Sequence, residues 1–359
     1  MEAITYTAAF LAALLLLTNG CHRAGVFDYA GWRVAHAGSG ERGLLFSLFA
    51  TMAAATAALN LDAAVLVMTP VVLAVASRRG IGHEAFSIST VHLANSASLL
   101  MPVSNLTNIM VFHETDLSFG HFTALMALPW LGAIAVERLL VPRLARPAEV
   151  RSPPELATVK PEVSVWPAAL LGIVLSGFIV SGPLGVEPLA IAWAGAAVMV
   201  LGELAGRTAG PVELVRAIRP LFLAALLALG GLAWLLGDLG LTDLIADLVP
   251  AGTGFGSLLL IAFGAAVLAN LINNIPATLI LLPAVAPAGE GALLAMLIGV
   301  GIGPNLAYPG SIANLLWRRV MIEDGAAVSW REFTRIGLVT VPTGIFVATA
   351  LLCVVYTGV

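Results

Sequence analysis

Hydrophobic residues occur in long runs along the whole chain, and short polar or Gly- and Pro-containing stretches separate them. Several runs reach the roughly 20 residues that an α-helix needs to cross the hydrocarbon core of a bilayer. Within Leu221–Leu236 apolar residues cover every face, which is typical of a spanning helix and unlike the alternation of a barrel strand. The expected apolar segments lie at residues 4–20, 44–77, 85–112, 120–140, 163–181, 189–205, 219–236, 254–284, 292–317 and 334–356.

The composition indicates that lipid is the solvent of this chain. Of its 359 residues, 59% are hydrophobic and 11% are charged, whereas soluble domains carry about 25% charged residues. The net charge of −4 gives no basic surface for nucleic acid. No basic residue precedes the first apolar run and no small-residue cleavage site follows it, so we interpret it as a retained helix. These features predict an all-α integral membrane protein with many spans, which we place in the plasma membrane.

A polar linker at residues 143–162 divides the chain into two halves, 1–142 and 163–359. The linker combines four prolines with four basic residues, so it is expected to be semi-extended and exposed. Cytoplasmic loops carry an excess of Lys and Arg, which puts the linker on the cytoplasmic side. Its basic residues are Arg143, Arg146, Arg151 and Lys160.

The two halves carry the same features in the same order, which predicts two inverted repeats. Asn60 lies ten residues before Pro70, and Asn273 lies ten residues before Pro283. The segments 163–181 and 189–205 have no counterpart in the first half, so the first repeat is expected to be short by two spans. Further matches pair Gly25 with Gly240, Ser98-Leu99 with Asn305-Leu306, Pro102 with Pro309, and Ser104 with Ser311.

Polar residues interrupt two apolar segments that are too long for single spans. The segment 44–77 is broken at Asn60-Leu61-Asp62, and 254–284 is broken at Asn273-Asn274. The flanking stretches of about 15 residues reach only part of the way across a bilayer, which predicts re-entrant hairpins with polar tips at membrane depth. Such breaks are tolerated chiefly where they line a cavity, so we interpret the tips as binding elements. The alternative is that these residues only cap helices.

Two further apolar segments are predicted to be broken helices. Four polar side chains fall within five positions of 85–112, and Pro, Gly, Asn and Ser interrupt 292–317 in the same manner. Hairpin tips and broken helices together supply dipole ends, free carbonyls and neutral hydrogen-bonding groups for a midplane site. The alternative is a pair of proline kinks sealed by their own side chains. The predicted substrate-binding residues are Asn60, Ser104, Asn105, Thr107, Asn108, Asn273, Asn274, Asn305, Ser311 and Asn314.

Asp62 is the one carboxylate that this segmentation puts deep in the membrane, so we predict that it couples transport to protons. The alternative is an N-cap aspartate held by helix N–H groups. His92 is interpreted as a packed side chain. The chain contains no Walker, Gly-x-Ser-x-Gly or His-Glu-x-x-His motif, which favours a secondary transporter over an enzyme. The two cysteines, Cys21 and Cys353, are too few for a metal cage, and no cofactor is expected beyond a coupling proton or sodium ion.

Four motifs resemble those of the arsenite efflux permeases, the arsenical pump membrane proteins, and the likeness extends over nearly the whole chain. The resemblance implies a scaffold and a mobile transport part that move in an elevator fashion. It also implies export of As(OH)3 or Sb(OH)3 in exchange for protons, a homodimer and, in some members, a soluble ATPase subunit on the cytoplasmic side. Leu61 departs from the family pattern, which often has a polar residue there. The motifs are Leu59–Pro70, Ala94–Asn108, Asn273–Pro276, and Gly303–Leu306 with Ser311–Trp317.

The residue types give a chemical check on the substrate. Chelation of As(III) by three thiolates is excluded for one protomer, because the chain has two cysteines. Hydroxyl and amide groups at the motifs suit a small neutral polyol, and no Lys or Arg falls among them. The expected function is export of arsenite or antimonite. A sodium-coupled carrier of small carboxylates and a non-transporting membrane anchor for a soluble enzyme are the alternatives, since helix N-termini alone can hold carboxylates.

Overall fold

The computed structural model describes residues 2–35, 50–54, 56, 61–78, 84–145, 160–250, 252 and 254–357. Within these ranges the protein is all helical and contains no strand. Seven helical stretches are long and apolar enough to cross a membrane, which confirms the prediction of a multi-pass membrane protein. They are Ile4–Arg23, Phe119–Leu144, Val165–Leu184, Pro188–Ala205, Pro211–Ala246, Phe255–Ile272 and Trp330–Tyr356.

The described part of the first half contains one full-length span at each end and shorter helices between them. A left-handed residue, Gly25 with φ of 73°, turns the chain from the first helix into the second. A side chain there would meet the carbonyl of Glu162 at 2.6 Å, so only glycine fits. The elements are α1 (Glu2–Arg23), α2 (Val26–Ala35), α4 (Leu61–Arg78), α5 (Glu84–Ala97), η1 (Pro102–Ser104), α6 (Leu106–His113) and α7 (Phe119–Leu144).

The second half adds two spans and then a similar series of elements. It contains α8 (Val165–Leu184), α9 (Pro188–Ala205), α10 (Pro211–Ala217), α11 (Pro220–Leu236), η2 (Gly237–Leu241), α12 (Thr242–Ala246), α13 (Phe255–Ile272), α14 (Asn274–Val285) and η3 (Ala286–Ala288). It continues with α15 (Glu290–Ile302), η4 (Gly303–Leu306), η5 (Tyr308–Gly310), α16 (Ile312–Glu323) and α17 (Trp330–Thr357). The predicted helix breaks at Asn273 and after Ile302 are therefore both present.

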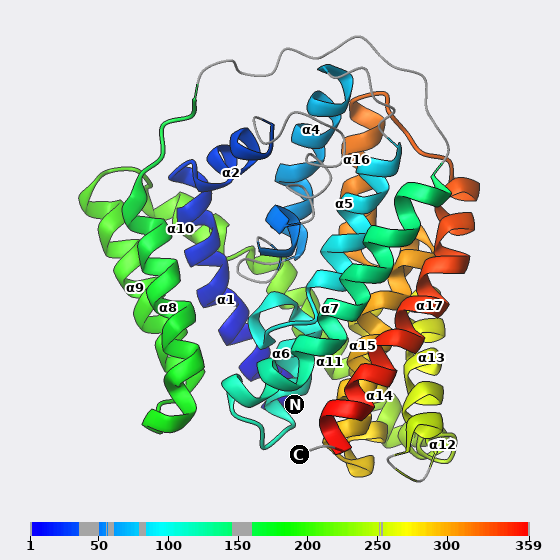
Figure 1. Ribbon diagram of the computed structural model, residues 1–359. Helices are drawn as coiled ribbons and strands as arrows, with labels where there is room; N and C mark the ends of the chain where they lie inside the picture. The colour runs from blue at the N-terminus through cyan, green and yellow to red at the C-terminus, as the bar shows by residue number, and fades with distance from the viewer. Residues whose placement is uncertain are drawn as a thin grey trace.

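The helices pack into one bundle in which α7 and α17 lie side by side in close contact (Figure 1). These two long helices run in opposite directions, since α7 ends at the upper side of the view and α17 begins there (Figure 1). The extra spans α8 and α9 lie beside α1 on one flank, and α13 to α15 lie on the other (Figure 1). Both termini lie at the lower side of the view (Figure 1).

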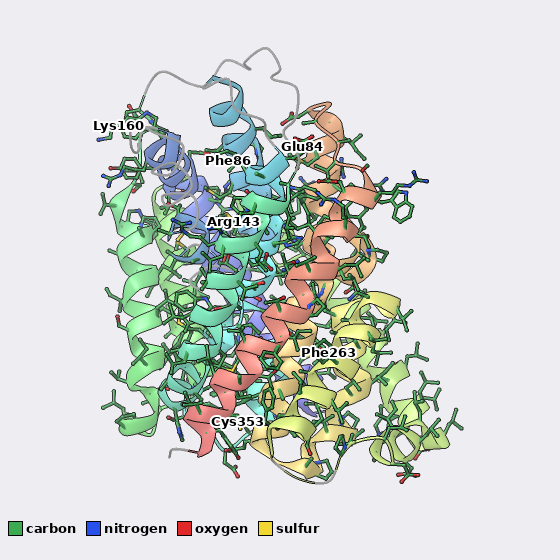
Figure 2. The ribbon with its side chains drawn as sticks, turned by 45° about the vertical axis from the view of Figure 1, so that its right-hand side comes forward. Glu84, Phe86, Arg143, Lys160, Phe263 and Cys353 are labelled. Carbon is green, nitrogen blue, oxygen red and sulfur yellow. The ribbon has the colours of Figure 1, made fainter. Side chains whose placement is uncertain are left out.

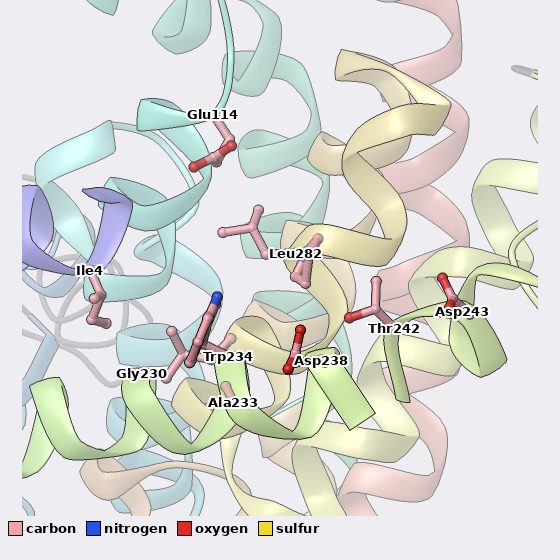
Figure 3. A pocket seen from close by; sticks show the side chains of 12 residues that line it. Ile4, Glu114, Gly230, Ala233, Trp234, Asp238, Thr242, Asp243 and Leu282 are labelled. Carbon is pink, nitrogen blue, oxygen red and sulfur yellow. The ribbon is translucent and has the colours of Figure 1, made fainter. Parts of the chain in front are cut away.

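The two ends of the bundle differ in charge. Basic groups gather at the upper end, where Arg23 pairs with Glu203 and Lys160 lies over the ring of Tyr29, 5.5 Å from its centroid. Lys160 and Glu84 lie at this end in Figure 2, whereas Phe263 and Cys353 lie in the lower half. Carboxylates border a pocket that the lower elements α11, η2 and α12 help to form. Figure 3 shows them as Glu114, Asp238 and Asp243.

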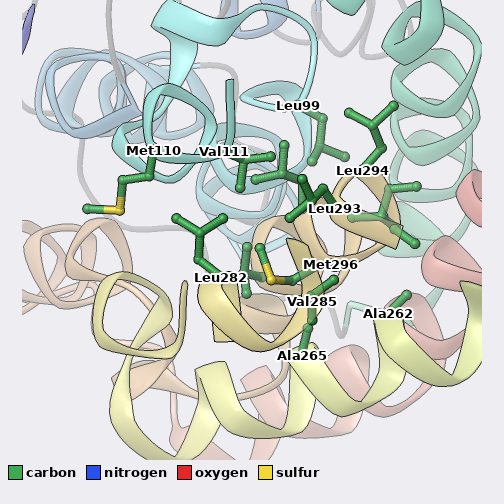
Figure 4. Packing of buried hydrophobic residues seen from close by; sticks show 14 of the residues in the cluster. Leu99, Met110, Val111, Ala262, Ala265, Leu282, Val285, Leu293, Leu294 and Met296 are labelled. Carbon is green, nitrogen blue, oxygen red and sulfur yellow. The ribbon is translucent and has the colours of Figure 1, made fainter. Parts of the chain in front are cut away.

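Small residues allow close helix contacts on the α13 side of the bundle. Ala262 and Ala265 of α13 face Met296 of α15 within one apolar cluster (Figure 4). A methyl group built on Gly299 would lie 2.1 Å from the carbonyl oxygen of Ala262, so the α15 backbone touches α13 directly. In lipid, where helices gain no hydrophobic free energy from association, such close packing is the main source of their affinity.

At each broken helix, one asparagine amide donates hydrogen bonds to two backbone carbonyls, and the sequence separations are the same in both helices. Asn108 donates from Nδ2 to the carbonyls of Ser98 (2.7 Å) and Met101 (3.0 Å), ten and seven residues earlier. Asn314 donates to the carbonyls of Pro304 (2.7 Å) and Ala307 (3.0 Å), at the same two separations. The matching bonds pair Ser98 with Pro304. The sequence alignment of Ser98 with Asn305 was therefore wrong by one residue, because it matched residue types and not backbone position.

We predict that Gly299→Ala destabilises the protein by about 1–3 kcal/mol, because the added methyl group must push α15 away from α13. Thermal unfolding of the purified protein in detergent measures the effect as a lower transition temperature. Gly264→Ala on α13 is the matched control, since its added methyl meets nothing within 4 Å. Equal transition temperatures for the two variants would contradict the direct contact between helices.

We also predict that Asn108→Ala and Asn314→Ala each cost about 1–3 kcal/mol or more, since each leaves two buried carbonyls without a donor. Asn314→Ala is expected to cost more, because Oδ1 of Asn314 also accepts from Asn95. The same unfolding experiment ranks the two variants. Thr343→Ala, an exposed position whose hydroxyl bonds only within its own helix, serves as the control and should leave the transition nearly unchanged.

Candidate functional site

Four helix N-termini meet around a small internal cavity of about 30 Å³. It is bordered by the first residues of α4 and α14, by the N-cap of α6 and by the first residue of α16. The first turn of a helix leaves N–H groups unpaired and carries a partial positive charge. None of the described residues lining the cavity is charged. They are Leu11, Leu61, Asn105, Leu106, Phe222, Asn274, Ile275 and Ile312.

Side-chain caps hold three of these helix starts in place. Asn105 accepts from the N–H of Thr107, and Asn273 accepts from the N–H of Ile275. Ser311 accepts from the N–H of Asn314 at 3.2 Å. The alternative of a capping role is therefore correct for Asn273, whereas the caps at Asn105 and Ser311 were not predicted. It does not exclude a binding role, because Asn105 caps α6 and also borders the cavity.

The hairpin tip is tied to the second broken helix. Asn273 has φ of 79°, a left-handed value that is uncommon outside glycine, and its Nδ2 donates to the carbonyl of Pro309 at 3.0 Å. One turn earlier, Asn270 donates to the carbonyl of Gly303 at 2.8 Å. These bonds join the α13–α14 hairpin to both ends of the break between α15 and α16. The hairpin and the break therefore form one connected unit.

A buried polar network lies on the other side of this break, centred on Asn305. The Asn305 Nδ2 donates to Glu137 Oε1 at 2.9 Å and to Ser96 Oγ at 3.1 Å. Asn95 Nδ2 donates to the Oδ1 atoms of Asn305 and Asn314, each at 2.8 Å. All five side chains are fully or almost fully buried. The network connects α5, α7, η4 and α16.

Glu137 completes the network and is a buried carboxylate that the sequence analysis did not single out. Glu137 is 1% exposed, and its Oε2 lies 3.0 Å from Nδ1 of His92. His92 is thus hydrogen-bonded to a carboxylate and is more than a packed side chain. In the sequence, Glu137 precedes Arg138 near the end of an apolar run. That pattern is typical of a helix leaving the membrane, so the sequence did not indicate that Glu137 is buried. In the structure α7 continues to Leu144.

The remaining predicted residues fall into three groups. Ser104 and Thr107 are buried in and beside the first break, and Oγ1 of Thr107 has no hydrogen bond within the described part of the chain. Asn60 lies outside the described residues. Asp62 is the second residue of α4, next to Leu61 at the cavity, but its side chain lies outside the described part. Asn95 was missing from the predicted set although its motif was noted.

A larger pocket of about 460 Å³ lies along the same helices toward the acidic end (Figure 3). Its wall contains Ile4 of α1, Gly230 of α11 and Leu279 of α14, and the small cavity is bordered by residues of these same three helices. Ile4 and Leu11 are seven residues apart, so about 10 Å along α1 separates the two spaces. The indole of Trp234 and the carboxylate of Asp238 lie in the wall of the larger pocket (Figure 3).

Comparisons with known proteins agree with this architecture. The arsenical pump membrane protein of Escherichia coli is 29% identical over 369 residues, covering 96% of this chain and 85% of its own. An uncharacterized transporter of Mycobacterium tuberculosis is 26% identical over 375 residues, with the same coverage. The crystal structure of the Alcanivorax borkumensis YdaH transporter matches with a TM-score of 0.61 at 17% identity, covering 99% of this chain and 87% of that one, which shows a shared fold.

The family model that matches is described as citrate transporter, and it covers residues 2–307. Together with the relatives named arsenical pump membrane protein, this match agrees with the resemblance seen in the four motifs. The chain therefore belongs to the CitMHS (citrate transporter) family of membrane transporters.

Proposed function

We propose that this protein is a secondary transporter that exports trivalent arsenite or antimonite in exchange for protons. The observation that carries the proposal is the small uncharged cavity where four helix N-termini meet. A space of about 30 Å³ holds roughly two water molecules. A compact solute such as As(OH)3 needs much less widening of this space than a citrate-sized ligand.

The chemistry of the lining also favours a neutral polyol. Amides at Asn105 and Asn274 and the N–H groups of the first helical turns supply donors and acceptors for hydroxyl groups. Neither cysteine borders the cavity, so recognition goes through amide side chains and backbone N–H groups, not through a thiol relay. Relatives named arsenical pump membrane protein support this substrate class.

The competing substrate is a small carboxylate carried with sodium. Its support is the family description and the positive dipole ends at the cavity, which suit an anion. No Lys or Arg among the described lining residues balances a carboxylate, and a tricarboxylate would need several such partners. A non-transporting anchor for a soluble enzyme is the third reading, and the converging N-termini argue against it because an anchor needs no internal cavity.

We further propose an inverted-repeat architecture with elevator motion of the hairpins and broken helices. The equal hydrogen-bond registers of Asn108 and Asn314 support the repeat, as do the opposite directions of α7 and α17. The bonds from Asn270 and Asn273 to the second break support movement of hairpin and break as one body. The first repeat, residues 1–142, contains no described counterpart of α8 and α9, and both of these spans pack on α1.

The charge asymmetry sets the proposed orientation in the plasma membrane. The basic end, at which the described residues on either side of the linker lie, faces the cytoplasm according to the positive-inside rule. A soluble ATPase subunit would dock at this end. The acidic pocket then opens outward and serves as the exit path from the cavity. A homodimer, which the resemblance implies, remains part of the proposal.

We predict gradient-driven uptake of trivalent arsenic into everted vesicles with an acidic interior, without added ATP. Asp62→Asn is expected to abolish the accumulation, because an amide cannot carry a proton at the second position of α4. Sodium-driven uptake of citrate or succinate in the same vesicles, without arsenic uptake, would instead establish the carboxylate carrier. Absence of any flux from proteoliposomes containing folded protein would favour the anchor.

We predict that Asn274→Ala raises the KM for trivalent arsenic about tenfold, which corresponds to about 1.4 kcal/mol for one lost hydrogen bond at the cavity. The same uptake assay, run over a range of arsenic concentrations, measures it. Asn19→Ala is the control: its amide donates to carbonyls of Leu15 and Ala217, away from the cavity, so its KM should not change. An unchanged KM for Asn274→Ala would remove this residue from the site.

A further inference from the structure

We propose that Glu137 and His92 form a proton-binding site, and that its protonation is coupled to the position of the broken helix through Asn305. This inference deepens the proposed exchange of substrate for protons and rests on it. The pair lies inside the protein, at 1% and 0% exposure, where α5 and α7 meet. It is separate from Asp62 on α4 and is not one of the residues that border the small cavity.

The argument begins with the contrast between two buried carboxylates. Glu203 is 3% exposed and is neutralised by Arg23, whose Nε and Nη2 lie 2.7 and 2.5 Å from its two oxygens. Glu137 has no Lys or Arg partner within the described part of the chain, and its ionisable neighbour there is His92. A buried carboxylate without a cation is costly, so the proton count of the Glu137–His92 pair decides its charge.

The described groups around the pair offer no other titratable partner. On α17 the neighbour of His92 is Phe333, with ring centroids 5.2 Å apart, and η4 contributes the Asn305 amide. Arg335 of α17 is engaged by Glu332 and by the carbonyl of Leu144. Arg318 of α16 lies over the ring of Tyr308, and Glu290 of α15 begins that helix. The ionisable side chains of α4, Asp62 and Arg78, lie outside the described residues.

The hydrogen bonds show why one proton makes a difference. Without it, His92 donates from Nδ1 to Glu137 and the pair carries one negative charge. With it, the pair is neutral overall, and a hydrogen occupies Nε2 of His92, which is buried without a hydrogen-bond partner in the described part. An unpaired N–H costs less than an uncompensated buried charge, so this closed conformation favours the loaded pair. Release requires a conformation in which the pair reaches water.

Asn305 connects the pair to the transport elements. Its Nδ2 binds Glu137 Oε1, and its Oδ1 accepts from Asn95, which also donates to Asn314. Asn314 lies in the first turn of α16, and the first residue of α16, Ile312, borders the cavity. Movement of η4 away from α7 breaks the Asn305–Glu137 bond and leaves the carboxylate free to exchange its proton. At this pair the balance is one proton bound from outside and released inside for each neutral As(OH)3 carried out, in addition to the proton that Asp62 carries.

The test measures proton release on substrate binding. Purified wild-type protein in weakly buffered detergent solution, with a pH-indicator dye, is mixed with As(OH)3, and binding is measured in parallel by equilibrium dialysis. Wild type is expected to bind and to release protons. Glu137→Gln is expected to bind arsenic and to release fewer protons per As(OH)3 than the wild type, because the proton of this pair is lost while that of Asp62 remains. Glu203→Gln, the other buried carboxylate, is the matched control and should release protons as the wild type does.

A second variant, His92→Gln, tests the same inference if Glu137→Gln does not fold. His92→Gln retains a donor toward Glu137 but cannot take up a proton, so the pH at which release is half-maximal should shift by about one unit. A merely structural role for the pair would lower the unfolding temperature without moving this midpoint. Undiminished release in Glu137→Gln, or an unmoved midpoint in His92→Gln, overturns the inference.

Failure of the proposed substrate gives a different result. If wild type binds no As(OH)3, the arsenite function is wrong, and the pair is tested alone by the infrared bands of its imidazole and carboxyl groups during a pH titration. Loss of a titrating band in Glu137→Gln, with retention in Glu203→Gln, supports the proton site for another substrate. The same titrating bands in both variants overturn it.

Discussion

Backbone N–H and C=O groups have no water to bind in hydrocarbon, and this constraint governs the structure of the transport region. Each broken helix frees carbonyls at membrane depth, and one asparagine amide satisfies two of them in each case, Asn108 in the first half and Asn314 in the second. The breaks persist because these amides replace the missing helical bonds. The helix starts that follow the two breaks, at Asn105 and Ile312, border a common cavity.

The cavity and the buried network share the second break. On one side, Asn273 and Asn270 tie the hairpin to it, and on the other side Asn305 ties it to Glu137. A displacement of this break therefore changes both the space available to a substrate and the partners of a buried carboxylate. Such an arrangement supplies a physical route for the proposed coupling, because one element carries contacts to both sites.

Charged residues are few in this protein and are unevenly distributed. Basic groups gather at one end of the bundle and carboxylates border the pocket near the other, while the cavity between them is lined by uncharged residues. Two carboxylates are buried in the described part, one with an arginine and one with a histidine. The two carboxylates therefore have partners of different kinds, since an arginine side chain is always a cation and a histidine side chain is not.

The sequence alone determined the all-helical membrane fold, the two helix breaks, the polar linker and the resemblance to arsenical pump proteins. These follow from local patterns: the length of an apolar run, a Pro or Asn inside it, and a cluster of basic residues. It also placed Asn273 at a helix start, since capping acts over three residues.

Only the tertiary structure decided which of these groups meet. The register of the two breaks depended on backbone hydrogen bonds and not on residue type, and so it differed by one residue from the alignment. Glu137 and His92 lie 45 residues apart in the chain, and Asn305 lies 168 residues beyond Glu137. No local pattern reports that a carboxylate near the end of an apolar run will be buried against a histidine from another helix, because burial is a property of the packed bundle.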